Sequence, residues 1–432
     1  MYQQYKRWGV IRVSDTLPLI CAAATFKYAY NYYSFIIPAL SGLFVMLYNV
    51  ITLFFLLLYI PIFLRVFSCI RIREYKPLKP LLIIPVMVLI NIMYVIVSSG
   101  DFSIVSKSYS MALAAGTNDA TGFYFSQINT WFGNMAVALM IAFYADSKEK
   151  LVKCISTSML VLIIPTILVA IMHPSYLGTR QSVYDDGSKF SGGLWNIGVV
   201  GFGSISWIGL SLIESATKKQ KKIIYFSTAV FIFVGVAGIS RTLILMVAFS
   251  VIAYFLLTRK DMSWIAKMGL VLLAVVLFCI LEPSFLTSVL SRFNDSTSGT
   301  QNIRIKLWKS YLSHWREYWL LGAPLGSVYN YYRDVDLFGA YFLPHSAPIN
   351  FFLRYGIVAL IAYIILLRNS FLSIQTNNQV EQKSRICILC GGIAYITLAF
   401  INQTGYAEII FYIMFGLLLA YARIEGYQEY CE

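Results

Sequence analysis

Charged side chains are scarce in this sequence. They make up 12% of its 432 residues, whereas hydrophobic residues make up 59%. Soluble proteins contain roughly 25% charged and 45–50% apolar residues. Because so few charges could not cover the surface of a soluble chain of this length, the composition excludes a set of soluble domains, a disordered chain and a nucleic-acid-binding globule. The net charge of +14 is therefore interpreted as a property of loops beside a membrane.

Cysteine is sparse as well, and its pattern carries no metal or disulfide signal. The seven cysteines are scattered at positions 21, 69, 154, 279, 387, 390 and 431. Cys387 and Cys390 form a CxxC pair, but they lie in an apolar segment with no other metal ligand nearby. We interpret them as small hydrophobic residues. The N-terminal residues lack the layout of a cleavable signal peptide, so the first apolar segment is expected to act as an uncleaved insertion signal.

Long apolar segments, in contrast, are abundant. A helix of about twenty apolar residues crosses a bilayer, and a helical bundle satisfies the backbone hydrogen bonds of such segments internally. The sequence therefore predicts an all-α polytopic membrane protein with about twelve transmembrane helices. These spans lie near residues 17–39, 43–67, 80–99, 127–145, 151–172, 194–213, 222–239, 241–258, 264–282, 347–367, 386–404 and 407–422.

The basic residues support this count and predict an orientation. With the N-terminus inside, the predicted cytoplasmic segments carry 22 Lys and Arg residues. The short outer loops carry only Lys107, Arg180, Lys189 and Arg241. This bias agrees with the positive-inside rule. Both termini are therefore expected on the cytoplasmic side.

One long outer loop, residues 283–346, interrupts the apolar pattern between helices 9 and 10. It divides the chain into residues 1–282 with helices 1–9, the loop itself, and residues 347–432 with helices 10–12 and a cytoplasmic tail. The loop is basic and holds two of the three histidines. Long loops escape the positive-inside bias, so the arrangement of these residues is more informative than their charge.

Residues 304–321 of this loop predict a helix in the membrane interface. Apolar side chains recur on one helical face at Trp308, Leu312, Trp315 and Trp319, and the polar ones fall largely elsewhere, at Lys306, Lys309, Ser313 and Arg316. Tryptophan on one face and basic groups on the other are typical of interfacial helices, whose cations can bind phosphate. The alternative is a helix that only caps the bundle. Glycine and proline then predict a tight turn after residue 321.

Two further polar residues stand at the borders of predicted spans. His345 lies where the outer loop meets helix 10, and an imidazole there could accept a proton from an attacking hydroxyl. Arg241 lies between two apolar spans joined by almost no loop, on the same outer side. A charge this close to hydrocarbon is a candidate functional residue. The alternatives are a structural histidine and an arginine that contacts lipid phosphate.

Three basic residues are weaker candidates for the same outer cavity: Lys27 in the first span, and Arg180 and Lys189 in the loop at 173–193. The sequence contains no GxxxxGK[ST], HExxH or GxSxG motif and no paired histidine and carboxylate motif for a metal. We therefore expect a reaction that needs no metal and no cofactor, on a substrate already activated by phosphate.

Together these segments resemble the O-antigen ligase and O-antigen polymerase superfamily of bacterial envelopes. The sequence RIKLWKSYLSHWREYWLLGAPLG at 304–326 resembles the family's Arg, Trp and glycine-turn pattern. HSAPINFFLRYG at 345–356 is similar to its His, Ser or Asn, and Gly eleven residues after the His. GISRT at 238–242 is similar to its Ser-Arg step, and FSGGLWN at 190–196 is a weaker echo of a further stretch.

The resemblance implies a GT-C-like glycosyltransferase of the bacterial cytoplasmic (inner) membrane whose active site faces the periplasm or exterior. Its substrate would be an oligosaccharide linked to undecaprenyl diphosphate. Transferred residue by residue, His345 would act as general base, and Arg241 and Arg304 would hold the departing diphosphate. Lys27, Arg180, Lys189, Lys306 and Arg316 would be supplementary contacts to diphosphate or glycan. A chain-length regulator is an implied partner.

Three functions are considered, and the first two share this transfer chemistry and differ in the acceptor. A polymerase transfers the glycan to the sugar of another lipid-linked repeat unit, and a ligase transfers it to lipid A-core. We favour the polymerase, for O-antigen or capsule repeat units, with inversion at the anomeric carbon. A flippase or transporter would instead require polar groups near the bilayer midplane and two related halves, whereas the polar groups here gather at one face.

Overall fold

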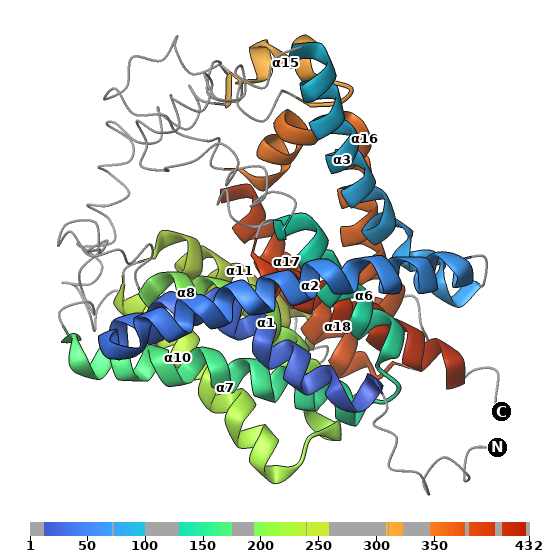
Figure 1. The fold of residues 1–432 in the computed structure, drawn as a ribbon. Helices are drawn as coiled ribbons and strands as arrows, with labels where there is room; N and C mark the ends of the chain where they lie inside the picture. The colour runs from blue at the N-terminus through green and yellow to red at the C-terminus, as the bar shows by residue number, and fades with distance from the viewer. Residues whose placement is uncertain are drawn as a thin grey trace, which may run out of the picture.

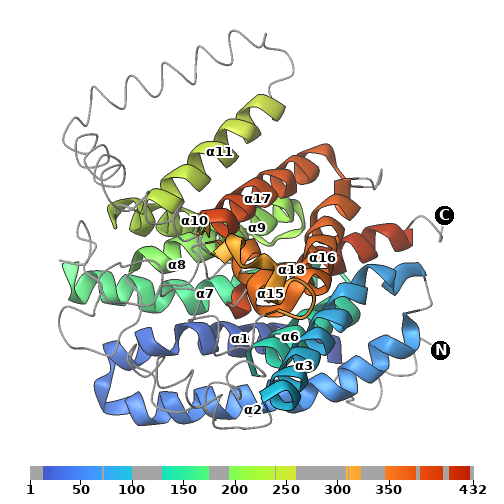
Figure 2. The same cartoon turned by 90° about the horizontal axis from the view of Figure 1, so that it is seen from above.

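The computed structural model describes residues 13–70, 73–99, 129–174, 194–238, 240–258, 308–309, 311–322, 346–375, 380–401 and 408–428. Within these ranges the chain forms helices and short connections, without a strand. This part of the molecule is a bundle of long helices (Figure 1). Several helices run in antiparallel pairs joined by tight connections, and α11 and α17 lie side by side (Figure 2). The predicted all-helical class is confirmed for the described residues.

The first half of the bundle comprises α1 (Val13–Ile36), α2 (Ser41–Cys69), α3 (Lys79–Ser99), α6 (Asn134–Tyr144) and α7 (Lys148–Met172). The second half comprises α8 (Leu194–Gly201), α9 (Trp207–Ser211), α10 (Lys218–Ala237), α11 (Arg241–Thr258), α15 (Trp315–Tyr318), α16 (Ala347–Gln375), α17 (Gln382–Ile401) and α18 (Ile409–Gln428). A π-helical turn precedes α6, and another joins α8 to α9.

Eleven of the predicted spans coincide with these helices, and the ninth, 264–282, lies outside the described residues. Six of the described helices are long and apolar enough to cross a membrane, and two shorter ones are also apolar. The total of twelve therefore stays a prediction, as do the domain boundaries. Two bounds differ by several residues: α16 continues to Gln375 and α18 to Gln428, because helices extend beyond the apolar segment that hydropathy detects.

The lipid-facing surface is clearest on α2. Large apolar side chains on this helix are exposed at Leu57, Ile60 and Leu64, with 60–63% of each side chain accessible. They recur three and four residues apart and so form one stripe. An exposed apolar stripe of this length would be costly in water, which supports a multi-pass membrane protein.

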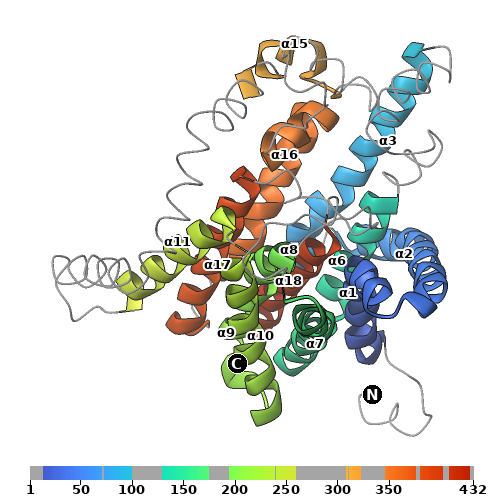
Figure 3. The same cartoon turned by 90° about the vertical axis from the view of Figure 1, so that its left-hand side faces the viewer.

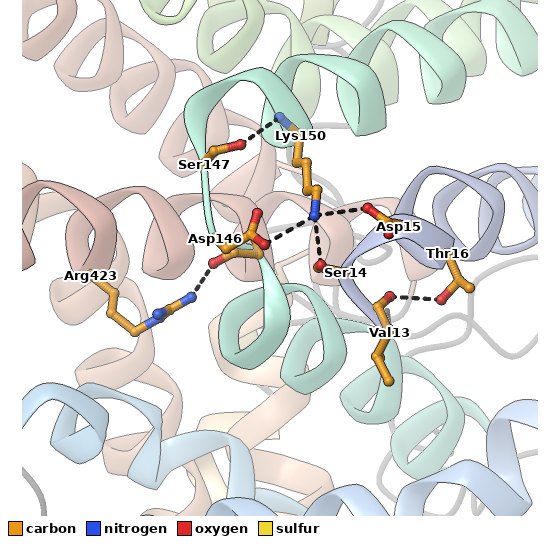
Figure 4. A network of polar contacts seen from close by, with 9 residues as sticks. Val13, Ser14, Asp15, Thr16, Asp146, Ser147, Lys150 and Arg423 are labelled. Atoms are coloured by element: carbon orange, nitrogen blue, oxygen red, sulfur yellow. Dashed lines mark hydrogen bonds and ion pairs between the residues drawn. The ribbon is translucent and has the colours of Figure 1, made fainter. Parts of the chain in front are cut away.

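Polar contacts tie several helices together at one end of the bundle (Figure 4). Lys150 at the start of α7 contacts Asp15 of α1 and Asp146 before α7, with both Nζ–Oδ distances at 3.0 Å. Lys150 also donates to Ser14. Arg423 of α18 donates to the carbonyls of Ala142 and Ala145 at the end of α6. These contacts fix the ends of α1, α6, α7 and α18 relative to one another.

At the opposite end, the start of α8 meets the second half of α1 and the connection that leads into α11, and we call this the motif end. Asn196 at the start of α8 donates to Tyr28 of α1, and Gly238, shortly before α11, packs on Trp195. Helices α3 and α16 pack against each other, and α16 reaches α15 at the top of Figure 1. Figure 3 shows the upper ends of α3 and α16 diverging. The predicted site residues that the structure describes lie at the motif end and in α15.

Candidate functional site

The structure describes only part of the predicted site. Five of the predicted residues lie outside the described residues: His345, Arg304, Lys306, Arg180 and Lys189. Arg241 is the first residue of α11, and its side chain is not described. Lys27 and Arg316 are described with their side chains. The geometry of the site is therefore derived from the segments that flank the predicted catalytic residues.

The segment around α15 docks on α16 through two glycines. Gly322 and Gly356 both have positive φ, at +83° and +77°, a backbone conformation that side chains disfavour. A Cβ atom on Gly322 would lie 2.2 Å from the carbonyl oxygen of Arg354, and one on Gly356 would lie 2.1 Å from that of Leu320. The two backbones thus meet at a distance that only glycine permits on both sides.

The same contact breaks α16. Gly356 is non-helical, with φ 77° and ψ −174°, so the helix consists of two pieces. The amide of Ile357, freed by this break, donates to the carbonyl of Trp319 at 2.7 Å. The piece from 357 to 375 has a rise of about 28 Å at 1.5 Å per residue, close to the thickness of the hydrocarbon layer. The piece before Gly356 is therefore available to form part of a polar site.

That first piece carries buried polar side chains directly after the predicted base. Ser346 and Asn350 are each 1% exposed, and Arg354 is 8% exposed. They are spaced four residues apart and so share one side of the helix. Within the described part of the chain, the Asn350 side-chain oxygen accepts no hydrogen bond. A buried polar face of this kind is costly in an apolar bundle and identifies the start of α16 as part of the site.

Two buried tyrosines form the inward face of the α15 segment. Tyr311 and Tyr318 are buried, at 0% and 1% exposure, and the Tyr318 hydroxyl donates to the Tyr311 carbonyl. Asn91 of α3 donates to the carbonyl of Leu321 at 2.5 Å. Sequence reasoning identified the tryptophan face of this helix and missed the tyrosine face, although the two tyrosines are seven residues apart and thus on one side.

Three of the four residues of the predicted tryptophan face point outward, whereas the fourth, Trp308, is half-buried. Leu312, Trp315 and Trp319 are 44–47% exposed, and Arg316 is exposed beside the Trp315 ring, with its guanidinium 5.9 Å from the ring centre. The predicted continuous helix is interrupted by a turn at His314, whose φ and ψ are −96° and 13°. The Ser313 hydroxyl contacts His314 Nδ1 at 3.1 Å, which agrees with a structural role for this histidine.

Two other motif segments also meet at the motif end. A Cβ atom on Gly238 would lie 2.7 Å from the Cβ of Trp195, so the start of α8 packs tightly against the end of α10. Ser240 then accepts a hydrogen bond from the Leu243 amide at 3.3 Å, as an N-terminal cap does. These contacts determine where α11 begins and place its first residue, Arg241, at the motif end.

Lys27 lies within the bundle in the half of α1 nearer the motif end. Its side chain is 8% exposed, and its Nζ lies 5.9 Å from the centre of the Tyr48 ring on α2. The Tyr48 ring packs against the Tyr30 ring in a tilted arrangement, with ring centres 4.3 Å apart. A cation over an aromatic face is attracted by the ring quadrupole. Lys27 is therefore held in place as a buried positive charge, as its sequence position suggested.

Further polar residues join α1 at this end, and sequence reasoning did not identify them. Asn196 at the start of α8 donates to the Tyr28 hydroxyl at 3.4 Å. Glu408 is partly exposed and directly precedes α18, which packs against α1. The sequence did contain a signal for Glu408. This carboxylate lies alone between two apolar spans, and charge at such a border is uncommon.

The family comparison covers the central part of these segments. Residues 226–364 match the family model described as O-antigen ligase. The match includes Arg241, Arg304, His345 and both docking glycines, Gly322 and Gly356. A search of curated proteins found no match for the chain.

Proposed function

Because this chain belongs to the O-antigen ligase and polymerase superfamily, we propose that it is a membrane-embedded polysaccharide polymerase. In this proposal it transfers a glycan from undecaprenyl diphosphate to a sugar hydroxyl of another lipid-linked repeat unit. The family supports a glycosyl-transferring enzyme of bacterial envelope synthesis. The donor, the acceptor and the GT-C class are part of the proposal.

One observation carries the proposal beyond the family match. The backbone of the α15 segment docks on α16 through Gly322 and Gly356, and this contact joins the two segments that flank the predicted base. An enzyme that handles a diphosphate must hold its cationic and basic groups on rigid supports. Docking by backbone contacts on both sides gives such a support.

The proposed chemistry is a direct displacement at the anomeric carbon. His345 accepts the proton of the acceptor hydroxyl, whose oxygen forms a bond to the anomeric carbon. The bond from that carbon to the phosphate oxygen breaks, and undecaprenyl diphosphate leaves with the electron pair. Arg241 and Arg304 bind this anion as its charge develops. Displacement from the opposite side inverts the configuration of the sugar.

Lys27, Arg180, Lys189, Lys306 and Arg316 are proposed as supplementary contacts to diphosphate or glycan. The site is proposed to face the periplasm or exterior from the cytoplasmic membrane, with both termini in the cytoplasm. A chain-length regulator remains a proposed partner, in addition to the bilayer and the lipid-linked oligosaccharide.

The experiment uses the purified full-length protein with a defined undecaprenyl-diphosphate-linked repeat unit as sole substrate, in the presence of EDTA. A ladder of lengthened glycans on a gel is the expected result, and His345→Ala should abolish it. His314→Ala is the matched control, because this histidine lies in the same loop and contacts Ser313. For the arginines, Arg241→Gln is compared with Arg368→Gln, since Arg368 is exposed on α16.

The other outcomes separate the alternative functions. If glycan is transferred only after lipid A-core is added, the protein is a ligase. If neither acceptor is used by intact protein, and cells lacking it accumulate the repeat unit on the cytoplasmic side, the protein is a flippase. A ladder from His345→Ala equal to that from the unmodified protein would contradict the assigned base.

A further inference from the structure

A group of polar and aromatic residues at the motif end is used by none of the roles assigned above. It comprises Tyr28 and Tyr32 of α1, Tyr48 of α2, Asn196 of α8 and Glu408 before α18. Asn196 donates to Tyr28, and both α2 and α18 pack against α1. These residues come from four separate parts of the chain, and Lys27 borders them. In an apolar bundle, one such residue needs little explanation, but a group of them is costly to assemble without a polar ligand.

We propose that Tyr28, Tyr32, Asn196 and Glu408 bind the sugar attached to the lipid diphosphate, beside a phosphate contact made by Lys27. This proposal rests on the proposed function and names a substrate subsite within it. The group is distinct from the predicted catalytic residues, since it lies on α1, α2, α8 and the connection before α18.

The hydrogen-bonding chemistry fits a sugar. A sugar presents neighbouring hydroxyls that both donate and accept hydrogen bonds. Glu408 supplies carboxylate oxygens, Asn196 supplies an amide, and the tyrosines supply hydroxyls that donate and accept. The Asn196 amide already reaches the Tyr28 hydroxyl at 3.4 Å, and Glu408 directly precedes α18, which packs against α1, the helix of Tyr28 and Tyr32. An amide and a carboxylate thus belong to elements that neighbour the tyrosine helix.

The aromatic and cationic neighbours fit the rest of the ligand. The rings of Tyr30 and Tyr48 lie against each other at a tilt, with ring centres 4.3 Å apart, and such amphipathic rings pack against the apolar face of a sugar. Lys27 lies over the Tyr48 ring and carries the positive charge that a phosphate requires. The order along the site would then be phosphate at Lys27 and sugar at Tyr48, Tyr28 and Glu408.

Accessibility agrees with a binding role. Tyr28, Tyr48, Asn196 and Glu408 are each partly exposed, whereas Lys27 and Tyr32 are buried at 8% and 5% exposure. The alternative is a purely structural role, in which Glu408 only stabilises the start of α18, where a negative charge is favourable. That alternative predicts a loss of stability and no selectivity for the sugar.

The test compares two lipids in binding measurements on the full-length protein in nanodiscs. One is undecaprenyl diphosphate, and the other is the same lipid carrying its repeat unit. Glu408→Gln and Tyr32→Phe are expected to weaken binding of the sugar-bearing lipid about tenfold and to leave binding of undecaprenyl diphosphate unchanged. Lys27→Met is expected to weaken binding of both lipids. Tyr59→Phe is the matched control, because the buried Tyr59 hydroxyl has no hydrogen-bond partner within the described residues.

Equal weakening of both lipids by Glu408→Gln would overturn the sugar subsite, as would unchanged binding of both lipids. A lowered Tm with unchanged binding would assign Glu408 to the start of α18 instead. Polymer formation by the unmodified protein, measured on the same preparation, tests the proposed function separately. The subsite can therefore fail while the polymerase function holds, and the reverse outcome is equally visible.

Discussion

Gly322 and Gly356 are 34 positions apart in the sequence, yet the segment ending at one packs on the backbone at the other. A Cβ on either residue would lie within 2.2 Å of a carbonyl oxygen of the partner segment. The contact joins the loop helix to the break in α16. It is the clearest mechanical link between two motif segments in the described part of the chain.

Gly356→Ala is therefore expected to displace the α15 segment and reduce activity about a hundredfold, the effect of moving a catalytic group by about 1 Å. Gly322→Ala should behave alike, because its φ is also positive. The measurement is polymer yield per folded protein. Gly42→Ala is the control, since a Cβ there meets nothing within 4 Å. Full activity of Gly356→Ala would show that the docking contact does not matter for turnover.

The buried hydrogen bond between Trp131 and Tyr355 gives a prediction about stability. Trp131 Nε1 donates to the Tyr355 hydroxyl at 2.5 Å, and the rings meet edge to face. Tyr355→Phe leaves this donor without its acceptor, which should cost about 1–3 kcal/mol. The expected result is a lower Tm in a thermal-shift assay. Tyr225→Phe, on an exposed side chain of α10, should leave Tm unchanged; equal shifts in both variants would refute the assignment.

The exposed tryptophans of the loop helix predict contact with lipid. In single-tryptophan variants, Trp319 should be quenched by lipids brominated near the headgroup, because tryptophans on one face and cations on the other favour the interface. Trp131, which is 1% exposed, is the control and should be quenched little. Quenching of Trp319 by aqueous iodide alone would support a helix that only caps the bundle.

Cys21 and Cys154 predict a specific cross-link between α1 and α7. Both cysteines are buried, and the two helices that carry them pack against each other. In a variant that retains only these cysteines, with a protease site in the connection between α3 and α6, a short bis-maleimide should hold the two fragments together on a denaturing gel. The pair Cys69 and Cys154 is the control, because these two cysteines also lie on separate fragments and Cys69 is at the far end of α2. Cross-linking of the control pair alone would show that α1 and α7 are not paired as described.

Much of the helical framework was accessible from the sequence. Apolar segments of about twenty residues are a local property, so they predicted eleven of the observed helices within a few residues at most ends. The outward face of the loop helix was predicted for the same reason, since Trp315 and Trp319 are spaced for one face. The extension of α16 to Gln375 was missed because polar residues continue a helix beyond its apolar segment.

The candidate site was only partly predictable. Lys27 and the glycine motif were recognised because charge in a span and glycine after a helix are local signals. The sequence did not reveal that Gly356 receives the backbone of Leu320, that Tyr311 and Tyr318 of the loop helix are buried, or that α18, which follows Glu408, packs against α1. No local pattern encodes which helices become neighbours.

The sequence by itself thus determined that this is a helical membrane protein with a basic loop helix and a family-typical order of motifs, because hydropathy, spacing and residue type act locally. Only the tertiary structure decided that the two glycine segments interlock, that Trp195 packs on Gly238 before Arg241, and that Asn196 reaches Tyr28. These contacts depend on how helices distant in sequence pack together, and packing is determined by the shapes of all their side chains at once.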